Sequence, residues 1–282
     1  MISQAKIKLI HSLDSKKGRK KEHAFVAEGP KVVGDLLAVA IPRFIVATEE
    51  WFKANHHLDC ETIVVTDEEL RKVSFLQHPQ QVLAVFPLPV DNSKLPEEKL
   101  SEKKTSEEEL SEEELSEENC NHKVQSSKFK VKSLILALDG VQDPGNLGTI
   151  IRIADWFGIT TLLCSHETAD AYSPKVIQAT MGSIARVRPI YVDLKEVISS
   201  LPADYPIYGT LLDGENIYQH ELTDYGMIIM GNEGNGISPE IRPLVNHRLL
   251  IPNFPPGRET ADSLNVAIAT AITCSEFRRR QI

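Results

Sequence analysis

The stretch LILALDGVQDPGNLGTIIRIADWFG, residues 134–158, decides the fold. It opens with an apolar run of strand length that ends at Asp139-Gly140, and a Pro-Gly turn follows. From Asn146 to Phe157 the apolar residues recur at helical spacing, and Gly158 is a stop signal. We therefore expect a buried strand, a tight turn and a helix that begins near Asn146, whose side chain can cap it.

The same alternation of strand and helix continues to the C-terminus. Successive strand–helix units of this kind predict a largely parallel sheet with helices on both faces. A cap residue followed by proline, Ser173-Pro174, marks the start of one helix. The expected strands are 160–165, 188–192, 205–214, 226–233 and 248–253, and further helices are expected at 193–201 and from Ser263 to Arg280.

Residues 1–88 predict a smaller α/β unit. A helix is expected after Gly29-Pro30, within residues 27–40. Thr66 has Glu69 three residues on, the pattern of a capping box at a second helix. Alternating helices and strands favour an α/β sandwich. The strands of this unit, rich in Val, Ile and Phe, are expected at 43–48, 62–66 and 81–88.

Residues 89–130 separate this unit from a second domain at 131–282. The segment contains the near-repeat SEEEL-SEEEL and has too few apolar side chains to offset the entropy of ordering. We interpret it as an acidic low-complexity linker, with a transient solvated helix as the alternative. Residues 90–120 carry a net charge of −8, nearly all of the −9 of the whole chain. Because salt screens charges beyond about 8–10 Å, this acidity does not exclude an RNA partner.

The remaining composition is that of a globular protein. No run of eighteen apolar residues and no signal peptide occurs, so we expect a cytoplasmic protein without a membrane partner. The four cysteines form no CxxC pair and are expected to be reduced thiols. We expect no metal site.

Two further stretches follow expected strands, where open α/β sheets bind ligands. The first, residues 228–241, reads IIMGNEGNGISPEI, and the second, residues 249–277, carries an Ile-Pro pair before a helix rich in small residues. The glycines at 231–236 permit close approach of a ligand to the backbone. Their GxxGxG spacing differs from the GxGxxG of dinucleotide sites, which disfavours a Rossmann-type nucleotide enzyme.

Taken together, the three stretches resemble the motifs of the SpoU, or TrmH-like, RNA methyltransferase family, in the family's order. Asn146 with Arg152 six residues on is similar to the first motif, and Gly231–Ser238 to the second. Ile251-Pro252 with Ser263–Ala271 is similar to the third. The resemblance covers about residues 131–282.

The N-terminal unit also resembles a part of this family. The sequence FVAEGPKVVGDLL, residues 25–37, is similar to the ribosomal-protein-like substrate-binding domain. One departure lies at 253–262, where the link between the Ile-Pro pair and Ser-Leu-Asn is longer than is usual in the family and contains two prolines.

The resemblance implies an S-adenosylmethionine-dependent enzyme that methylates a ribose 2′-hydroxyl. It implies an α/β fold: a C-terminal trefoil-knot methyltransferase domain beside the smaller substrate-binding domain, assembled as a homodimer through the C-terminal domain. The two-domain layout favours ribosomal RNA. A tRNA 2′-O-methyltransferase, or a non-catalytic RNA-binding or ribosome-assembly factor on the same scaffold, remains an alternative.

The resemblance also implies roles for individual residues. Arg152 activates the 2′-hydroxyl in the family view; because arginine stays protonated, we expect it to stabilise a phosphate or the developing oxyanion instead of acting as a base. Glu233 is the best candidate to accept a proton, and Asn146 and Asn265 would hold the site. The cofactor is expected at Thr210, Leu211, Gly231, Ile251 and Leu264.

Positive charge near the N-terminus indicates where RNA is held. The first thirty residues carry a net charge of +4. A solvated charged segment is the alternative to a phosphate-binding one. We expect phosphate contacts from Lys16, Lys17, Arg19, Lys20 and Lys21, and also from Arg278–Arg280.

Overall fold

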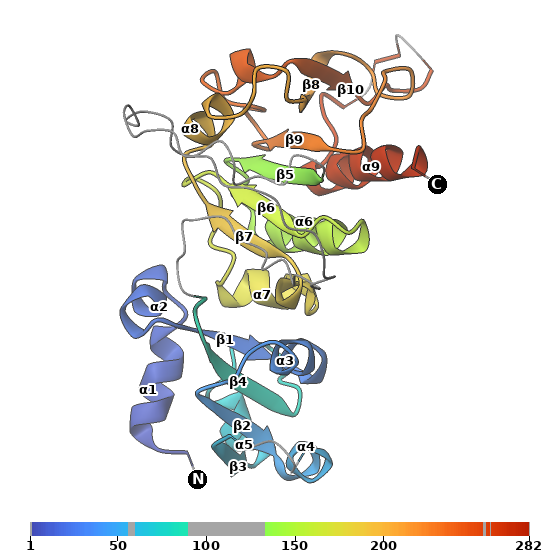
Figure 1. Cartoon of the computed structure of the whole chain (residues 1–282). Coiled ribbons are helices and arrows are strands. Elements are labelled where there is room, and N and C mark those ends of the chain that lie inside the picture. Colours follow the sequence, from blue (N-terminus) through green and yellow to red (C-terminus); the bar gives the residue numbers. More distant parts are fainter. Residues whose placement is uncertain (1, 56–59, 90–132, 256–257, 260, 282) are drawn as a thin grey trace, which may run out of the picture.

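A computed structural model describes residues 2–55, 60–89, 133–255, 258–259 and 261–281. The chain forms two α/β units, each built on its own sheet, with the smaller N-terminal unit below the C-terminal one in Figure 1. The expected linker, residues 89–130, lies outside the described residues beyond its first position.

The N-terminal unit has a four-stranded sheet in the order β1-β4-β2-β3. Strand β4 is antiparallel to both of its neighbours, whereas β2 and β3 are parallel. In chain order the elements are α1 (Gln4–Ser12), α2 (Lys16–Glu22), β1 (Ala24–Glu28), α3 (Pro30–Leu37), β2 (Phe44–Thr48), α4 (Glu49–Ala54), β3 (Thr62–Val65), α5 (Asp67–Arg71) and β4 (Val82–Pro87).

Both faces of this sheet are buried, which confirms the expected sandwich. Because side chains alternate along a strand, Phe25 and Ala27 of β1 face α3, whereas Ala24 and Val26 face α1 and α5. The capping box at α5 is present, with Thr66 and Glu69 each bonding the other's backbone.

The C-terminal unit has six strands in the order β10-β8-β9-β5-β6-β7, and every neighbouring pair is parallel. The predicted parallel sheet is thus confirmed. Its elements are β5 (Leu134–Asp139), α6 (Pro144–Trp156), β6 (Thr161–Cys164), α7 (Pro174–Thr180), a 3₁₀ turn η1 (Ser183–Ala185), β7 (Arg188–Tyr191), α8 (Leu194–Ser199), β8 (Ile207–Asn216), β9 (Gly226–Gly231), a 3₁₀ turn η2 (Arg242–Leu244), β10 (His247–Leu250) and α9 (Val266–Arg279).

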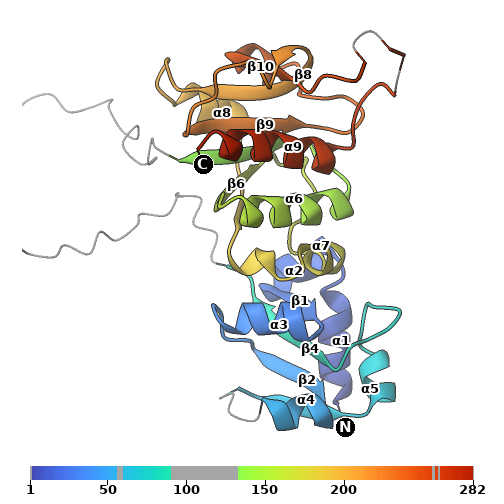
Figure 2. The same ribbon diagram turned by 90° about the vertical axis from the view of Figure 1, so that its right-hand side faces the viewer.

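Helices cover both faces of this sheet. Helices α6, α7 and α9 pack on one face, over side chains such as Leu136 and Ile228. Helix α8 packs on the other, over Ile135 and Ile229. Figure 2 shows α6 and α9 running side by side on the covered face. The knotted path that the resemblance implies stays a prediction.

The two units share a buried core. Helix α7 packs against β1 and α3, and apolar residues of both units belong to one contiguous cluster. Phe25 of β1 and Tyr172, just before α7, have ring centroids 5.1 Å apart. On the other side of the junction, Arg186 bridges Asp35 and Asp155. Within the described part of the chain, no helix is long and apolar enough to cross a membrane.

Candidate active site

A cavity of about 420 Å³ opens at the carboxyl ends of β8, β9 and β10 and at the start of α9. Parallel strands place their carboxyl ends at one edge of the sheet, where the loops leave room for a ligand. The walls mix aliphatic side chains with exposed backbone. All five residues expected to bind the cofactor line it, namely Thr210, Leu211, Gly231, Ile251 and Leu264.

The glycine-rich loop forms one wall of this cavity as a closed turn. Asn232 and Gly236 exchange backbone hydrogen bonds of 2.9 and 3.0 Å. A Cβ at Gly231 would lie 2.2 Å from the carbonyl carbon of Gly236, and Gly236 itself has φ +68°. Both positions therefore need glycine, the first for close approach and the second for its backbone conformation.

Two polar side chains that the sequence did not single out hold this loop in place. Asp139, at the end of β5, accepts a 2.7 Å hydrogen bond from the Ser238 amide. The Asn232 side chain accepts from the Gly234 and Asn235 amides and donates to the Gly140 carbonyl at 2.7 Å. The glycine-rich composition around Asn232 could have indicated such an Asx turn, because asparagine side chains commonly bond the backbone two residues on.

Three of the four residues expected at the catalytic centre meet in a hydrogen-bonded chain. The Asn265 amide nitrogen donates to the Asn146 side-chain oxygen at 3.0 Å, and the Asn146 amide nitrogen donates to Glu233 Oε1 at 3.0 Å. Asn265 uses its own oxygen to accept from the Ala267 and Ile268 amides. This fixes the polarity of the chain, because Asn265 has only its amide nitrogen left to offer.

The local structure explains why these side chains meet. Asn265 is the N-cap of α9, and its capping bonds orient the side chain towards α6. Helix α6 starts at Pro144 with Asp143 as its N-cap, so the expected cap role of Asn146 was wrong. Asp143 accepts from the Asn146 amide at 2.8 Å, which leaves the Asn146 side chain free for Glu233. Asp143-Pro144 has the same cap–proline pattern as Ser173-Pro174 and could have been recognised.

Other boundaries also differ from expectation. Helix α9 begins at Val266 and not at Ser263, because Asn265 provides the cap. Ser263 and Leu264 lie outside the helix and line the cavity. The described part of the 253–262 loop is held by a 3.0 Å bond from Asn253 Nδ2 to the Arg258 carbonyl.

Arg152 stands apart from the chain of amides. It lies six residues beyond Asn146, so it is rotated by about 240° and lies about 9 Å further along the helix. Its side chain is exposed, and no described residue forms a hydrogen bond or ion pair with it. The structure therefore brings together Asn146, Glu233 and Asn265, but not Arg152.

The expected RNA-contacting residues divide into two groups. Lys16, Lys17, Lys20 and Lys21 are exposed on α2, as a phosphate contact requires. Arg19 is not: its side chain is buried and bonded within the protein, so the expectation of a phosphate contact there is corrected.

The arginines at the end of α9 also bind the protein itself. Arg278 donates to the Phe157 carbonyl at 2.8 Å and so satisfies the C-terminus of α6. Arg279 and Arg280 both pair with Glu276, and Arg280 also reaches the Ile217 carbonyl. These bonds hold the end of α9 to the protein, but the Arg279 side chain stays 66% exposed, so a phosphate contact here stays a prediction. Among the described residues, no group of His, Cys, Asp or Glu is placed to bind a metal ion.

Comparison with known proteins agrees with this geometry. The model of the SpoU rRNA methylase family matches residues 133–275, and that of the MRM3-like substrate binding domain matches residues 4–84. The 23S rRNA (guanosine(2553)-2′-O)-methyltransferase RlmP of Bacillus subtilis is 27% identical over 277 residues, which is 97% of this chain and 96% of that protein.

Solved structures agree over the whole length. A protein from Porphyromonas gingivalis described as an RNA methyltransferase of the TrmH family is 36% identical, with a TM-score of 0.78 and 99% of each chain covered. An AdoMet-bound rRNA methyltransferase from Sinorhizobium meliloti is 26% identical, with a TM-score of 0.76, covering 100% of this chain and 97% of that one. The family model matches half of this chain, and the Porphyromonas gingivalis protein is 36% identical over nearly the whole length. The chain therefore belongs to the SpoU rRNA methylase family.

Proposed function

We propose that this protein transfers a methyl group from S-adenosylmethionine to a ribose 2′-hydroxyl of ribosomal RNA. The observation that carries the proposal is that the Glu233 carboxylate, fixed by Asn146, lines the same cavity as the five expected cofactor residues. Ribosomal RNA is favoured over tRNA because the full-length relative RlmP is named for 23S rRNA. The cytoplasmic location expected from the sequence is part of this proposal.

The cavity suits S-adenosylmethionine. Its volume falls within the range of about 300–1,000 Å³ that is typical of small-molecule sites. Aliphatic walls from Leu249, Ile251 and Val266 suit the flat face of an adenine, and the bare Gly231 lets a ligand reach the backbone. When bound, the cofactor supplies a methyl group already activated on a sulfonium.

The protein's own residues then have two tasks. They must hold the ribose hydroxyl in line with the methyl group, which can contribute several kcal/mol by orientation alone. They must also help the hydroxyl to lose its proton. Glu233 accepts that proton, since its carboxylate is exposed at the cavity and Asn146 fixes its orientation.

We further propose that Arg152 acts across a homodimer interface formed by α6 and α9. Arg152 forms no bond with its own Glu233 chain, and it lies four residues before the exposed Trp156, on the same side of α6. Trp156 of α6 is 85% exposed, and Leu264 and Ile268 near the start of α9 are 51% and 53% exposed. A second copy of the chain would cover this surface, as the family resemblance implies, and bring Arg152 to the partner's ribose.

Transfer of tritium from methyl-labelled S-adenosylmethionine tests the proposed reaction. Unmodified 23S rRNA, 16S rRNA and tRNA transcripts should be offered in parallel, with Glu233→Gln as the matched variant of equal size. We expect label in 23S rRNA, at a nucleotide resistant to alkaline hydrolysis because its 2′-oxygen is methylated. Label in tRNA alone would move the substrate to the alternative class. RNA binding without transfer would indicate a non-catalytic factor.

A further inference from the structure

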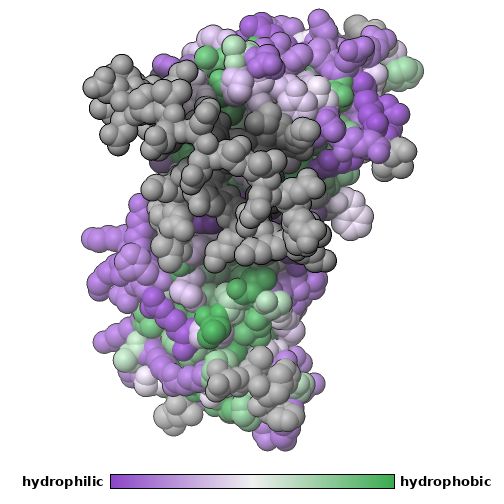
Figure 3. Space-filling view, in the orientation of Figure 1, coloured by the Kyte–Doolittle hydropathy of each residue, from purple (hydrophilic) through white to green (hydrophobic). Residues whose placement is uncertain are grey.

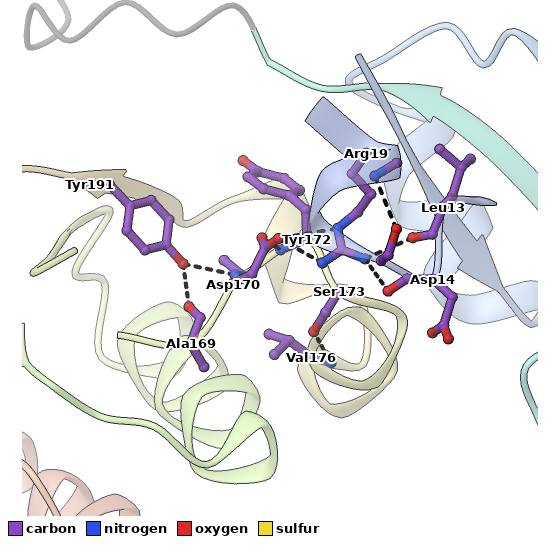
Figure 4. Close-up of polar contacts among 12 residues, drawn as sticks. Leu13, Asp14, Arg19, Ala169, Asp170, Tyr172, Ser173, Val176 and Tyr191 are labelled. Atoms are coloured by element: carbon purple, nitrogen blue, oxygen red, sulfur yellow. Dashed lines mark hydrogen bonds and ion pairs between the residues drawn. The ribbon is translucent and has the colours of Figure 1, made fainter. Parts of the chain in front are cut away.

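The side chain of Arg19 joins the two domains. It is 3% exposed, and its Nε and one terminal nitrogen bond Asp170 at 3.1 and 2.7 Å. The other terminal nitrogen bonds the Leu13 and Asp14 carbonyls at 2.7 and 2.6 Å. Figure 4 shows the guanidinium between the α1–α2 turn and the loop that leads from β6 to α7. All three guanidinium nitrogens of Arg19 are therefore bonded to groups at the domain junction.

Helix α2 is closely fixed at this junction. A Cβ at Gly18 would lie 1.8 Å from the Ser12 carbonyl oxygen, so the helix packs against the end of α1 without space for a side chain. Lys16 Nζ lies 6.0 Å from the centre of the Tyr191 ring, at the end of β7 in the other domain. Tyr191 in turn bonds the backbone at Ala169 and Ala171, on either side of Asp170 (Figure 4).

These contacts place α2 on the edge of the sheet that carries the candidate active site. Asp170 follows β6 and Tyr191 ends β7, just as Gly231 ends β9 and precedes Glu233. All of these strands are parallel, so their carboxyl ends share one edge. Strand β7 is three positions from β9, which corresponds to about 14 Å along that edge.

The outward face of α2 carries the positive charge. Lys16, Lys17, Lys20 and Lys21 are exposed, and the flank on which α2 lies is hydrophilic in Figure 3. Arg19 is the one basic residue of the helix that points inward. Helix α2 is thus fixed to the protein by the buried Arg19, and its four lysines face the solvent.

We propose that Arg19 is a positioning residue that aligns the α2 lysines with the active-site edge, so that one RNA strand runs over the ends of β7 and β6 to Glu233. The inference rests on the proposed function. This role differs from a general role in stability. It requires that substitution of Arg19 weaken RNA binding only because the α2 lysines are then misplaced. A buried ion pair removed from one side is destabilising in any case, so melting temperature alone does not decide.

A double-mutant cycle tests this coupling. The binding of an unmodified 23S rRNA transcript should be measured by filter binding across a salt series. The variants are Arg19→Met, the quadruple alanine variant of the four lysines, and their combination. We expect Arg19→Met and the quadruple alanine variant each to weaken RNA binding about tenfold or more. Each should also flatten the plot of log affinity against log salt concentration, since each lost phosphate contact removes about 0.7–0.9 from its slope. In the Arg19→Met background the lysine substitutions should add little.

Three further variants keep the test decisive. Asp170→Asn leaves Arg19 bonded to its two carbonyls and serves if Arg19→Met fails to fold; Arg19→Lys should restore part of the binding. Arg186→Met is the matched control, because it removes a domain-bridging ion pair that does not touch α2. It should leave the salt slope unchanged, and the affinity for S-adenosylmethionine should be unchanged in every variant.

Additive losses from Arg19 and the lysines would overturn the inference, as would an Arg186→Met variant that flattens the slope equally. The binding cycle does not depend on catalysis. If the wild-type protein binds the transcript but transfers no methyl group, the proposed reaction fails while the role of Arg19 is still decided.

Discussion

At the scale of single residues, Arg152 carries the sharpest functional expectation. Its guanidinium is exposed and unpaired among the described residues, so its removal leaves no buried charge behind. We expect Arg152→Ala to lower methyl transfer by about 100–1000-fold, the usual cost of losing a donor to a developing oxyanion. Melting temperature and S-adenosylmethionine affinity should stay at wild-type values. Activity within about twofold of wild type would exclude the role.

Asn265 has two tasks that a pair of substitutions can separate. Asn265→Asp keeps the oxygen that caps α9 but loses the nitrogen that donates to Asn146. We expect this variant to keep its melting temperature and lose most of its activity, because Asn146 is then free to turn away from Glu233. Asn265→Ala loses both contacts, and the missing cap should cost about 1 kcal/mol of stability as well. An active Asn265→Asp enzyme would show that the amide chain is not needed for catalysis.

At the scale of elements, the end of α9 is held by charge. Hydrogen bonds from Arg279 and Arg280 lower the pKa of the Glu276 carboxyl to about 2. Because this pKa lies below that of an unfolded glutamate, near 4.3, ionised Glu276 stabilises the fold at neutral pH, and this contribution fades as the pH falls towards 2. Glu276→Gln should therefore melt below wild type at pH 7, with a difference that narrows from about pH 4 downwards. A difference that is constant with pH would contradict this.

The elements that the sequence predicted well are those with strong local signals. Strand β5 and helix α6 follow from one apolar run and one helical repeat, and α5 follows from its capping box. The N-terminal helices α1 and α2 were not predicted. Lysines dominate that segment, so the sequence pattern does not reveal its two fully buried side chains, Ile10 and Leu13. Strand β1 was taken in part as helix, since Ala27 and Glu28 precede the proline at which α3 begins.

The candidate site was predicted to the extent that its residues lie in recognisable motifs. Asn146, Glu233 and Asn265 were chosen from three separate stretches, and the fold brings them into one chain of hydrogen bonds. Arg19 shows the limit of such reasoning. Its partner Asp170 lies 151 residues further along the chain, so no local pattern separates this buried arginine from the exposed lysines around it.

At the scale of the whole molecule, the exposed surface of α6 and α9 predicts a dimer. Light scattering at micromolar concentration should give a mass near twice 31.4 kDa. Ile268→Glu should shift the protein towards the monomer, because it places a charge among apolar side chains. Ile41→Glu is the matched control, since Ile41 is equally apolar, 79% exposed and in the other domain. A monomer for the wild-type protein would contradict the proposed interface.

Mixed dimers test whether Arg152 serves the partner subunit. Arg152→Ala and Glu233→Gln are each expected to be inactive, because each lacks one part of every site. If Arg152 acts across a two-fold interface, a dimer of one variant with the other contains one site that has both residues intact, since each defect falls in the same remaining site. Random exchange of equal amounts should then restore about a quarter of the wild-type activity. If Arg152 acts within its own subunit, every site in the mixed dimer lacks one residue, and mixing should restore nothing.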